Sequence, residues 1–334
     1  MPDPYQQVID ALSRCRRVLI TTHVRPDGDA LGSAAAMHLA LKRKGIESEV
    51  LLLTHLPRKY ACIFGDYGVP STDVERGWPA DWRFDRFDAL LVLDTGTWSQ
   101  LPGLQERIAS WRAPRVVIDH HLTQENWADV RLIVTEAAAA GEIVAELLEA
   151  WDVELDRDIA TALFLAVASD TGWFAFSNTR PYTLRLAATL IEAGVDTDRM
   201  YQHLYQSESA HRVALQTRAM QSLELLAGGR LAVMTLSKAD FAQTGASVPD
   251  TENLVNIPMQ IADVEMSMLV TDPPEGGPVR VSLRSKGEVD VSAFAERFGG
   301  GGHARAAGLK IDAPLGDVHD RVVRAAVALL QSGI

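Results

Sequence analysis

The chain has 334 residues and carries 32 lysines and arginines against 44 aspartates and glutamates, which gives a formal net charge of −12. A protein that coats long nucleic acids normally presents a strongly basic face, and the sequence contains no basic run. The acidic balance still permits a small phosphorylated substrate, because a few local cations or bound metal ions can hold one. The length indicates about two domains.

The cysteine content and the apolar runs limit the cellular setting. The two cysteines, Cys15 and Cys62, lie far apart and outside any paired motif, which argues against a disulfide framework or a zinc ribbon and fits a reducing cytoplasm. Residues 1–17 are polar and do not resemble a secretory signal. No apolar run approaches the ~18 residues that span a bilayer. We therefore expect a cytoplasmic protein without a membrane partner.

Short apolar segments alternate with helical ones in the first part of the chain. This alternation predicts a mostly parallel sheet with helices on both faces. The expected strands are 18–22, 48–53, 89–93, 115–118 and 130–134, and the expected helices are 5–14, 30–44, 101–110, 140–150, 158–169, 181–193 and 209–226. The stretch 54–87 holds three prolines and is expected to be irregular.

The pattern changes near residue 195. Further strands are expected at 231–236, 264–270, 279–285 and 309–311, with helices at 291–298 and 315–330. We predict an α/β fold of two domains: a larger N-terminal parallel-sheet domain over 1–190, a helical linker over 191–215 and a smaller C-terminal α/β domain over 216–334. An active-site cleft is expected between the domains.

Acidic and histidine residues follow three of the apolar strands, and a fourth acidic turn follows a buried helix. In parallel α/β sheets, ligands gather at the carboxyl ends of the strands, so these separate turns can converge on one edge of the sheet. Taken alone, an aspartate after a strand is usually a turn former or a helix cap rather than a metal ligand, and adjacent histidines are often surface residues. The four turns in order favour one joint metal site. They are His23, Asp27 and Asp29, then Asp94, then Asp119, His120 and His121, and finally Asp170.

The donor types indicate a pair of hard divalent ions. Nitrogen and oxygen donors without a thiolate favour Mn²⁺ or Mg²⁺, and the histidines tilt the choice toward Mn²⁺. Four carboxylates (Asp27, Asp29, Asp94 and Asp170) offset two dications, so an anionic phosphate can enter. Two ions about 3.5–4 Å apart can share a hydroxide nucleophile and stabilise the leaving oxygen of an in-line displacement.

A glycine run, Gly299–Gly302, precedes His303 in the C-terminal part. It is not a Walker loop, because no Lys-Ser/Thr follows, and it is not a dinucleotide fingerprint, because it follows a helix. Its backbone N–H groups can approach an anion, and Arg284 can hold a phosphate with two hydrogen bonds. The alternative is a structural turn with a solvated arginine.

Other residues near the motifs allow two interpretations. Trp173, Phe174 and Phe176 follow Asp170 and could stack on a base, although aromatic residues after a buried helix usually belong to the core. Lys286 and Arg305 are as easily explained by solvated charges.

Together these motifs resemble the DHH phosphoesterase superfamily, which is named for the Asp-His-His sequence found here at 119–121. The four turns correspond to its N-terminal motifs, and the segment 299–308 resembles the signature of the DHH-associated C-terminal domain. Within the superfamily the sequence is most similar to the nanoRNase and 3′-phosphoadenosine-5′-phosphate phosphatase group, the NrnA type.

The resemblance implies a role for each site residue. His23, Asp27 and Asp94 would bind one Mn²⁺, and Asp29, Asp94, His120 and Asp170 would bind the other, with Asp94 bridging. His121 and Asp119 would be the catalytic pair, His121 beside the substrate phosphate and Asp119 orienting a histidine. Arg284, Gly300, Gly301, Gly302 and His303 would bind the substrate. Mg²⁺ is the alternative ion.

The resemblance also implies the reaction. We expect a Mn²⁺-dependent phosphohydrolase, an exonuclease of very short RNA that releases mononucleotides and also dephosphorylates 3′-phosphoadenosine 5′-phosphate through a bridging hydroxide. Its partners would be short RNA oligonucleotides and phosphorylated nucleotides. The alternative is a cyclic-dinucleotide or linear-dinucleotide phosphodiesterase. A non-catalytic nucleotide-binding protein is disfavoured because no ligand is missing. The oligomeric state stays open, with a homodimer as one candidate.

Overall fold

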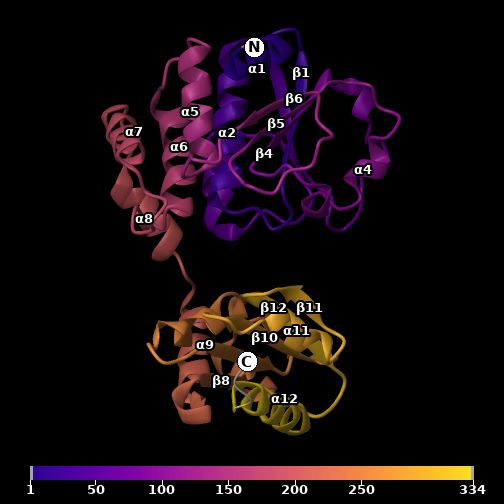
Figure 1. Cartoon of the computed structure of the whole chain (residues 1–334), viewed down its shortest axis with the longest axis vertical. Helices are drawn as coiled ribbons and strands as arrows, with labels where there is room; N and C mark the ends of the chain where they lie inside the picture. Colours follow the sequence, from indigo (N-terminus) through magenta and orange to yellow (C-terminus); the bar gives the residue numbers. More distant parts are fainter. Residues whose placement is uncertain (1–2, 332–334) are drawn as a thin grey trace. The chain divides into compact units, whose positions relative to one another are not determined.

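The computed structural model describes residues 3–331, apart from the side chain of His303. The chain forms two compact units, unit 1 (Met1–Ser207) and unit 2 (Glu208–Ile334). Unit 1 is built around a six-stranded parallel sheet of order β3-β2-β1-β4-β5-β6 (Figure 1). The sequence predicts a mostly parallel sheet here and five of its strands, all except β3. Its strands are β1 (Arg17–Thr22), β2 (Glu47–Leu52), β3 (Ser71–Asp73), β4 (Ala89–Leu93), β5 (Arg115–Asp119) and β6 (Val130–Ile133).

Helices cover both faces of this sheet. They are α1 (Pro4–Leu12), α2 (Gly28–Arg43), α3 (Ala61–Asp66), α4 (Leu104–Arg107), α5 (Ala140–Ala150), α6 (Arg157–Asp170), α7 (Pro181–Glu192) and α8 (Thr197–Tyr205). Alternate residues of β4 enter different cores: Leu91 packs with the helices α2, α5 and α6, whereas Leu90 and Val92 pack on the opposite face with α4. Every residue of β4 is buried for this reason, which is typical of a central parallel strand.

The stretch 54–87 is more ordered than the sequence suggests. It contains α3 and the edge strand β3, which adds only three residues to the sheet beside β2. Such a short strand carries too few residues for an alternating pattern to be visible.

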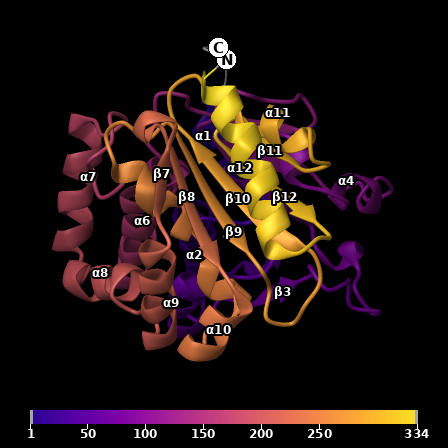
Figure 2. The same cartoon turned by 90° about the horizontal axis from the view of Figure 1, so that it is seen from below.

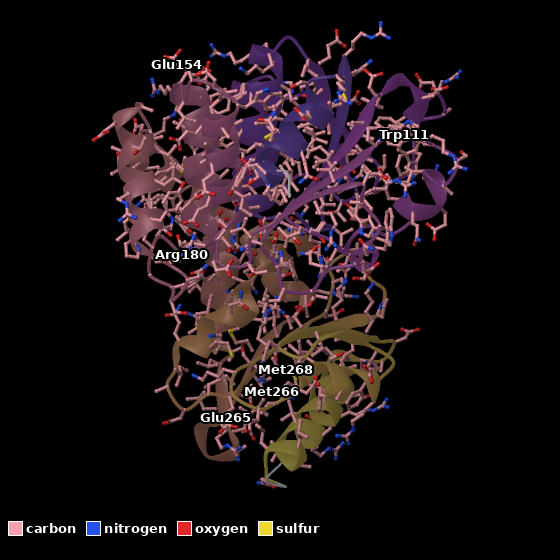
Figure 3. All side chains as sticks on the ribbon, turned by 45° about the horizontal axis from the view of Figure 1, so that its top comes forward. Trp111, Glu154, Arg180, Glu265, Met266 and Met268 are labelled. Atoms are coloured by element: carbon pink, nitrogen blue, oxygen red, sulfur yellow. The ribbon has the colours of Figure 1, made fainter. Side chains whose placement is uncertain are left out.

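Unit 2 is an α/β domain around a mixed sheet of order β11-β12-β10-β9-β8-β7, in which only the pair β8–β9 is parallel. Helix α12 lies across one face of the sheet (Figure 2). Met266 and Met268, which are labelled in Figure 3, belong to the core that includes residues of α12. Glu265 Oε1 lies 2.7 Å from Arg230 Nε. The elements are α9 (Ala210–Gln221), β7 (Glu224–Leu226), β8 (Leu231–Leu236), α10 (Lys238–Thr244), β9 (Met266–Thr271), β10 (Val279–Ser285), α11 (Val291–Glu296), β11 (Gly301–His303), β12 (Ala306–Ile311) and α12 (Leu315–Gln331).

The predicted helix 209–226 is wrong at its C-terminal end. Helix α9 ends at Gln221, and the next residues form β7, which pairs with β8. The hydroxyl of Ser222 accepts a hydrogen bond from Thr235 N and donates to Thr235 O. These contacts with β8 outweigh the local helical pattern.

Within residues 3–331, no helix is long and apolar enough to cross a membrane.

The predicted linker 191–215 contains α8, whose Met200 belongs to the core of unit 1, and the start of α9, whose Leu215 belongs to a core of unit 2.

Helices α2 and α6 approach closely because small residues face each other. A Cβ added at Gly32 would lie 2.5 Å from Ala162 O and 2.8 Å from Ala166 N. At the start of α2, a Cβ at Gly28 would lie 2.1 Å from Ser169 Oγ. Both glycines therefore allow α2, which carries Asp29, to pack directly on α6, which carries Asp170.

We predict that Gly32→Ala lowers the free energy of unfolding by roughly 1–3 kcal/mol, because the added methyl group meets backbone atoms that cannot rotate away. Urea denaturation measures the effect. Gly65→Ala is the matched control, since a Cβ at Gly65 in α3 meets nothing within 4 Å. Equal midpoints for Gly32→Ala and the wild type would contradict the close packing of α2 on α6.

Candidate metal centre

Three neighbouring strands bring the predicted ligands of unit 1 to one edge of the parallel sheet. His23 follows β1, Asp94 follows β4, and Asp119 ends β5 with His120 directly behind it. Because β1, β4 and β5 are adjacent and parallel, their carboxyl ends lie side by side. The N-terminal end of α2 and the C-terminal end of α6 supply the remaining carboxylates.

Asp94 lies at the centre of this group. Its side chain is 3% exposed, and its two oxygens face two different imidazoles, with Oδ2 3.4 Å from His23 Nε2 and Oδ1 3.4 Å from His120 Nε2. The Oδ1 atom is buried and accepts no hydrogen bond among the described residues. Its backbone is left-handed, with φ of 62°. A buried carboxylate oxygen without a donor is costly unless a cation or another partner compensates it.

The donors around Asp94 form three overlapping groups: two correspond to the predicted ligand sets, and the third consists of Asp94, His120 and His121. In the first, ligand atoms of His23, Asp27 and Asp94 all lie within 4.8 Å of one another. In the second, the same holds for Asp29, His120 and Asp170. Each group offers imidazole and carboxylate donors without sulfur, which suits Mn²⁺ or Mg²⁺. The residues therefore fit a pair of divalent ions.

The two imidazoles are held with the same nitrogen toward the carboxylates. His23 Nδ1 lies 2.9 Å from Val24 O, and His120 Nδ1 lies 3.1 Å from Ala137 O. A backbone carbonyl accepts only from a protonated Nδ1, so Nε2 is left to face Asp94 in both rings. This is the arrangement of a histidine prepared to bind a metal through Nε2.

Asp29 is bound to the N-terminus of α5, a contact that the sequence analysis missed. Its Oδ2 accepts from Ala140 N at 2.6 Å and its Oδ1 accepts from Gly141 N at 2.9 Å. Ser33 Oγ also donates to Oδ1. The run of four alanines before Gly141 is the only local signal, since small residues allow such a close approach.

Asp119 orients His121. Its carboxylate is fully buried and lies 2.7 Å from His121 Nδ1, which turns Nε2 of this half-exposed ring outward. The Oδ1 atom also accepts from His120 N, and Gln124 Nε2 donates to Oδ2. The sequence analysis missed Gln124, although its position three residues after His121 was a usable signal. The contact shows which histidine Asp119 touches, and its catalytic role stays a prediction.

The pKa values of these residues are shifted because charged groups are buried close to one another. Burial opposes a charge on His23, but contact with Asp94 and the charge of Asp27 raise its pKa to about 9. Burial likewise opposes a charge on His120, and its carboxylate neighbours raise its pKa to about 10. Burial and the nearby carboxylates raise the pKa of Asp170 to about 6. Protonated imidazoles thus supply the positive charge that this set of carboxylates requires.

The substrate-binding residues predicted in unit 2 lie on or beside its sheet. Arg284 is on β10, and its Nη1 donates to Leu283 O. Gly300 and Gly302 leave no room for a side chain. A Cβ at Gly300 would lie 2.4 Å from Gly308 O, and a Cβ at Gly302 would lie 2.5 Å from Ala306 O. A Cβ at Gly301 meets nothing within 4 Å. The backbone of His303 ends β11, but its side chain lies outside the described part of the chain.

The other charged candidates of unit 2 have structural partners. Lys286 Nζ donates to Met259 O and Ile261 O, and Arg305 Nη1 donates to Val289 O.

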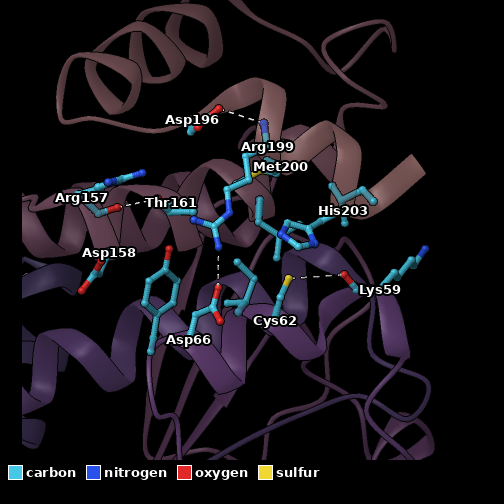
Figure 4. Close-up of a pocket in the computed structure, with 14 residues that line it drawn as sticks. Lys59, Cys62, Asp66, Arg157, Asp158, Thr161, Asp196, Arg199, Met200 and His203 are labelled. Carbon is cyan, nitrogen blue, oxygen red and sulfur yellow. Dashed lines mark hydrogen bonds and ion pairs between the residues drawn. The ribbon is translucent and has the colours of Figure 1, made fainter. Parts of the chain in front are cut away.

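A separate pocket of about 350 Å³ lies between α3, α6 and α8 (Figure 4). It is lined by three lysine or arginine side chains and by three aspartates, and Arg199 Nη2 lies 3.4 Å from Asp66 Oδ2. These opposite charges offset each other and leave no surplus of positive charge for a phosphate. None of the predicted site residues lines the pocket.

Two family models match the chain. The model of the DHH family, N-terminal domain, matches residues 17–167, and the model of the DHHA1 domain matches residues 228–332. The chain therefore contains a DHH domain and a DHHA1 domain. The DHH match includes every candidate metal ligand except Asp170, which lies three residues beyond it, and the DHHA1 match includes the glycine run. With these domains and these donors, the chain is a metal-dependent phosphoesterase.

Three relatives align with more than nine-tenths of this chain. The bifunctional oligoribonuclease and PAP phosphatase NrnA of Thermus thermophilus is 28% identical over 92% of this chain and 88% of its own length. The protein of the same name from Bacillus subtilis is 25% identical over 91% and 92%. The cyclic-di-AMP phosphodiesterase GdpP of Geobacillus thermodenitrificans is 26% identical over 94% of this chain but 47% of its own length.

Solved structures agree on the fold. An exopolyphosphatase-related protein from Bacteroides fragilis superposes with a TM-score of 0.80 at 22% identity, covering 98% of this chain and 97% of its own. The two-domain DHH and DHHA1 fold predicted from the sequence is confirmed.

We predict that loading the metal centre releases protons. A ligating imidazole must be neutral, and His23 and His120, with pKa values of about 9 and about 10, are charged at neutral pH. The affinity for Mn²⁺ should therefore rise with pH up to about 9–10. Calorimetric titration at pH 7.5 in buffers of different ionisation enthalpy should report about two protons released.

His55→Ala is the matched control for this titration. His55, Asp73 and Glu75 form an exposed group of similar donors in the same unit. The variant should leave the proton count unchanged. A measured enthalpy that does not depend on the buffer would contradict protonated ligands.

Proposed function

We propose that the chain is a Mn²⁺-dependent phosphohydrolase that degrades very short oligoribonucleotides to mononucleotides and dephosphorylates 3′-phosphoadenosine 5′-phosphate. The observation that carries the proposal is the convergence of two histidine–carboxylate groups on the buried Asp94. The two NrnA relatives, which match over about nine-tenths of this chain, support the choice of substrate.

The candidate ligands of unit 1 would hold two metal ions. His23, Asp27 and Asp94 would hold one ion, and Asp29, Asp94, His120 and Asp170 would hold the other. Two such ions, when bound, activate a water molecule and neutralise charge that develops on the phosphate.

His121 would hold the substrate phosphate. The hydrogen bond from its Nδ1 to Asp119 raises the pKa of His121 above its usual value, which favours a positive ring with Nε2 exposed. Such a group can donate to a phosphate oxygen and stabilise charge that develops there.

The DHHA1 domain would bind the rest of the substrate. We infer that Arg284 pairs with a phosphate through its guanidinium and that the backbone at Gly301 approaches an anion, since it is the one position of Gly300–Gly302 that packing leaves open. Gly300 and Gly302 would shape this loop, and His303 would add a hydrogen bond to the phosphate.

The second candidate function is a cyclic-dinucleotide or linear-dinucleotide phosphodiesterase. The GdpP relative supports it, because a protein named for that activity aligns with 94% of this chain. Mg²⁺ as the ion, a homodimer and a cytoplasmic location remain predictions.

We predict that Asp94→Asn lowers kcat at least about 1000-fold with Mn²⁺ and a five-residue RNA, because a neutral amide cannot bridge two cations. The measurement is release of mononucleotides, with circular dichroism to verify the fold. His55→Ala is the control and should keep full activity, since its exposed group is not part of the proposed centre. Substantial turnover by Asp94→Asn would refute the assignment.

A substrate panel separates the two candidate functions. We expect kcat/KM to be highest for RNA of two to five residues, with measurable release of phosphate from 3′-phosphoadenosine 5′-phosphate. All reactions are run with Mn²⁺ under the same conditions and include cyclic di-AMP. A clear preference for cyclic di-AMP over linear RNA would favour the phosphodiesterase instead.

A further inference from the structure

The loop after Asp170 has an unusual backbone. Gly172, Trp173 and Phe174 are all left-handed, with φ of 55°, 56° and 64°. For residues with side chains this conformation costs roughly 1–2 kcal/mol each, so the surrounding structure must impose it.

Hydrogen bonds fix this loop to the end of α6. Phe174 N donates to the hydroxyl of the buried Thr171 at 3.1 Å, and Phe176 N donates to Thr171 O at 3.0 Å. Asn178 Nδ2 donates both to Asp170 O at 3.2 Å and to Ala138 O at 3.0 Å. The loop is therefore tied directly to the backbone of a predicted metal ligand.

Two aromatic side chains of the loop pack on the core, and the third is exposed. Trp173 and Phe174 pack on Phe164, with ring centroids 5.9 Å and 5.7 Å away, so the core explanation holds for them. Phe176 is 59% exposed. Across residues 3–331, its ring packs in no core cluster and stacks on no other aromatic side chain.

The ring of Phe176 belongs to the loop that directly follows Asp170, a candidate metal ligand. It rests on Gly172, where an added Cβ would be 2.5 Å from the Cζ atom of Phe176. Gly172 is two residues from Asp170, and Asp170 Oδ2 is 3.8 Å from His120 Nε2. A large apolar ring is thus exposed to solvent on a loop whose backbone is hydrogen-bonded to that of Asp170, a candidate ligand.

We propose that Phe176 stacks on a nucleobase of a short RNA whose phosphate would bind at the candidate metal centre. The inference rests on the proposed function and adds a base-binding position to it. A phenyl ring offers a flat face and no hydrogen-bonding group, so it binds any base without reading the sequence. A ring that the fold already positions also loses little conformational entropy on binding.

The test compares kcat/KM for the RNA dinucleotide ApA and for two analogues that each lack one base, all with Mn²⁺. Phe176→Ala should lower kcat/KM for ApA roughly 5- to 100-fold. On the analogue that lacks the stacked base, the variant and the wild type should be equal. Phe176→Trp should keep activity on ApA, whereas Phe176→Leu should lose it as Ala does, because leucine keeps apolar volume without a ring.

Leu184→Ala is the matched control, since Leu184 is a 53% exposed apolar residue on α7 of the same unit. It should change none of the three values. Equal losses by the Ala and Leu variants on all three substrates, or no loss on ApA, would overturn the stacking role alone. If the wild type hydrolyses none of the three substrates, the proposed function fails, and the stacking role fails with it.

Discussion

The buried carboxylate of Asp94 is the constraint on which the rest of the centre depends. A charged group in the interior needs compensation, and the fold brings His23 from β1 and His120 from the end of β5 to its two oxygens. The left-handed backbone of Asp94 ends β4 and turns the side chain among these partners. One residue therefore links three strand ends and both candidate metal groups.

The backbone of unit 1 takes part in this arrangement as much as the side chains do. The segment at the start of α5 accepts from His120 through Ala137 O and donates to Asp29 through Ala140 N and Gly141 N. Asn178 connects the same segment to the end of α6. The ligands are consequently oriented by groups that no catalytic motif contains.

The sequence predicts what is local and periodic in this protein. The apolar strands and the turns that follow them identified the parallel sheet and its edge, because strand direction alone brings His23, Asp94 and His120 into one region. The sequence could not reveal that Asn178 and the start of α5 hold the candidate ligands in place, since these contacts join residues far apart in the chain. It also missed β7, where contacts with β8 override a helical pattern. In the glycine run, packing against β12 explains the need for glycine at 300 and 302, two positions to which the family resemblance assigns substrate binding.

The close contact between α2 and α6 has a consequence for the choice of ion. Gly28 and Gly32 let the two helices touch through backbone and small side chains, close to the helix ends that carry Asp29 and Asp170. Residues outside the candidate ligand set therefore contribute to the spacing of these two carboxylates. Mg²⁺ prefers oxygen ligands at about 2.0–2.1 Å, whereas Ca²⁺ prefers about 2.3–2.6 Å and more of them. Carboxylate spacing is one property by which a protein selects an ion, and here it rests on two positions where a hydrogen atom replaces a side chain.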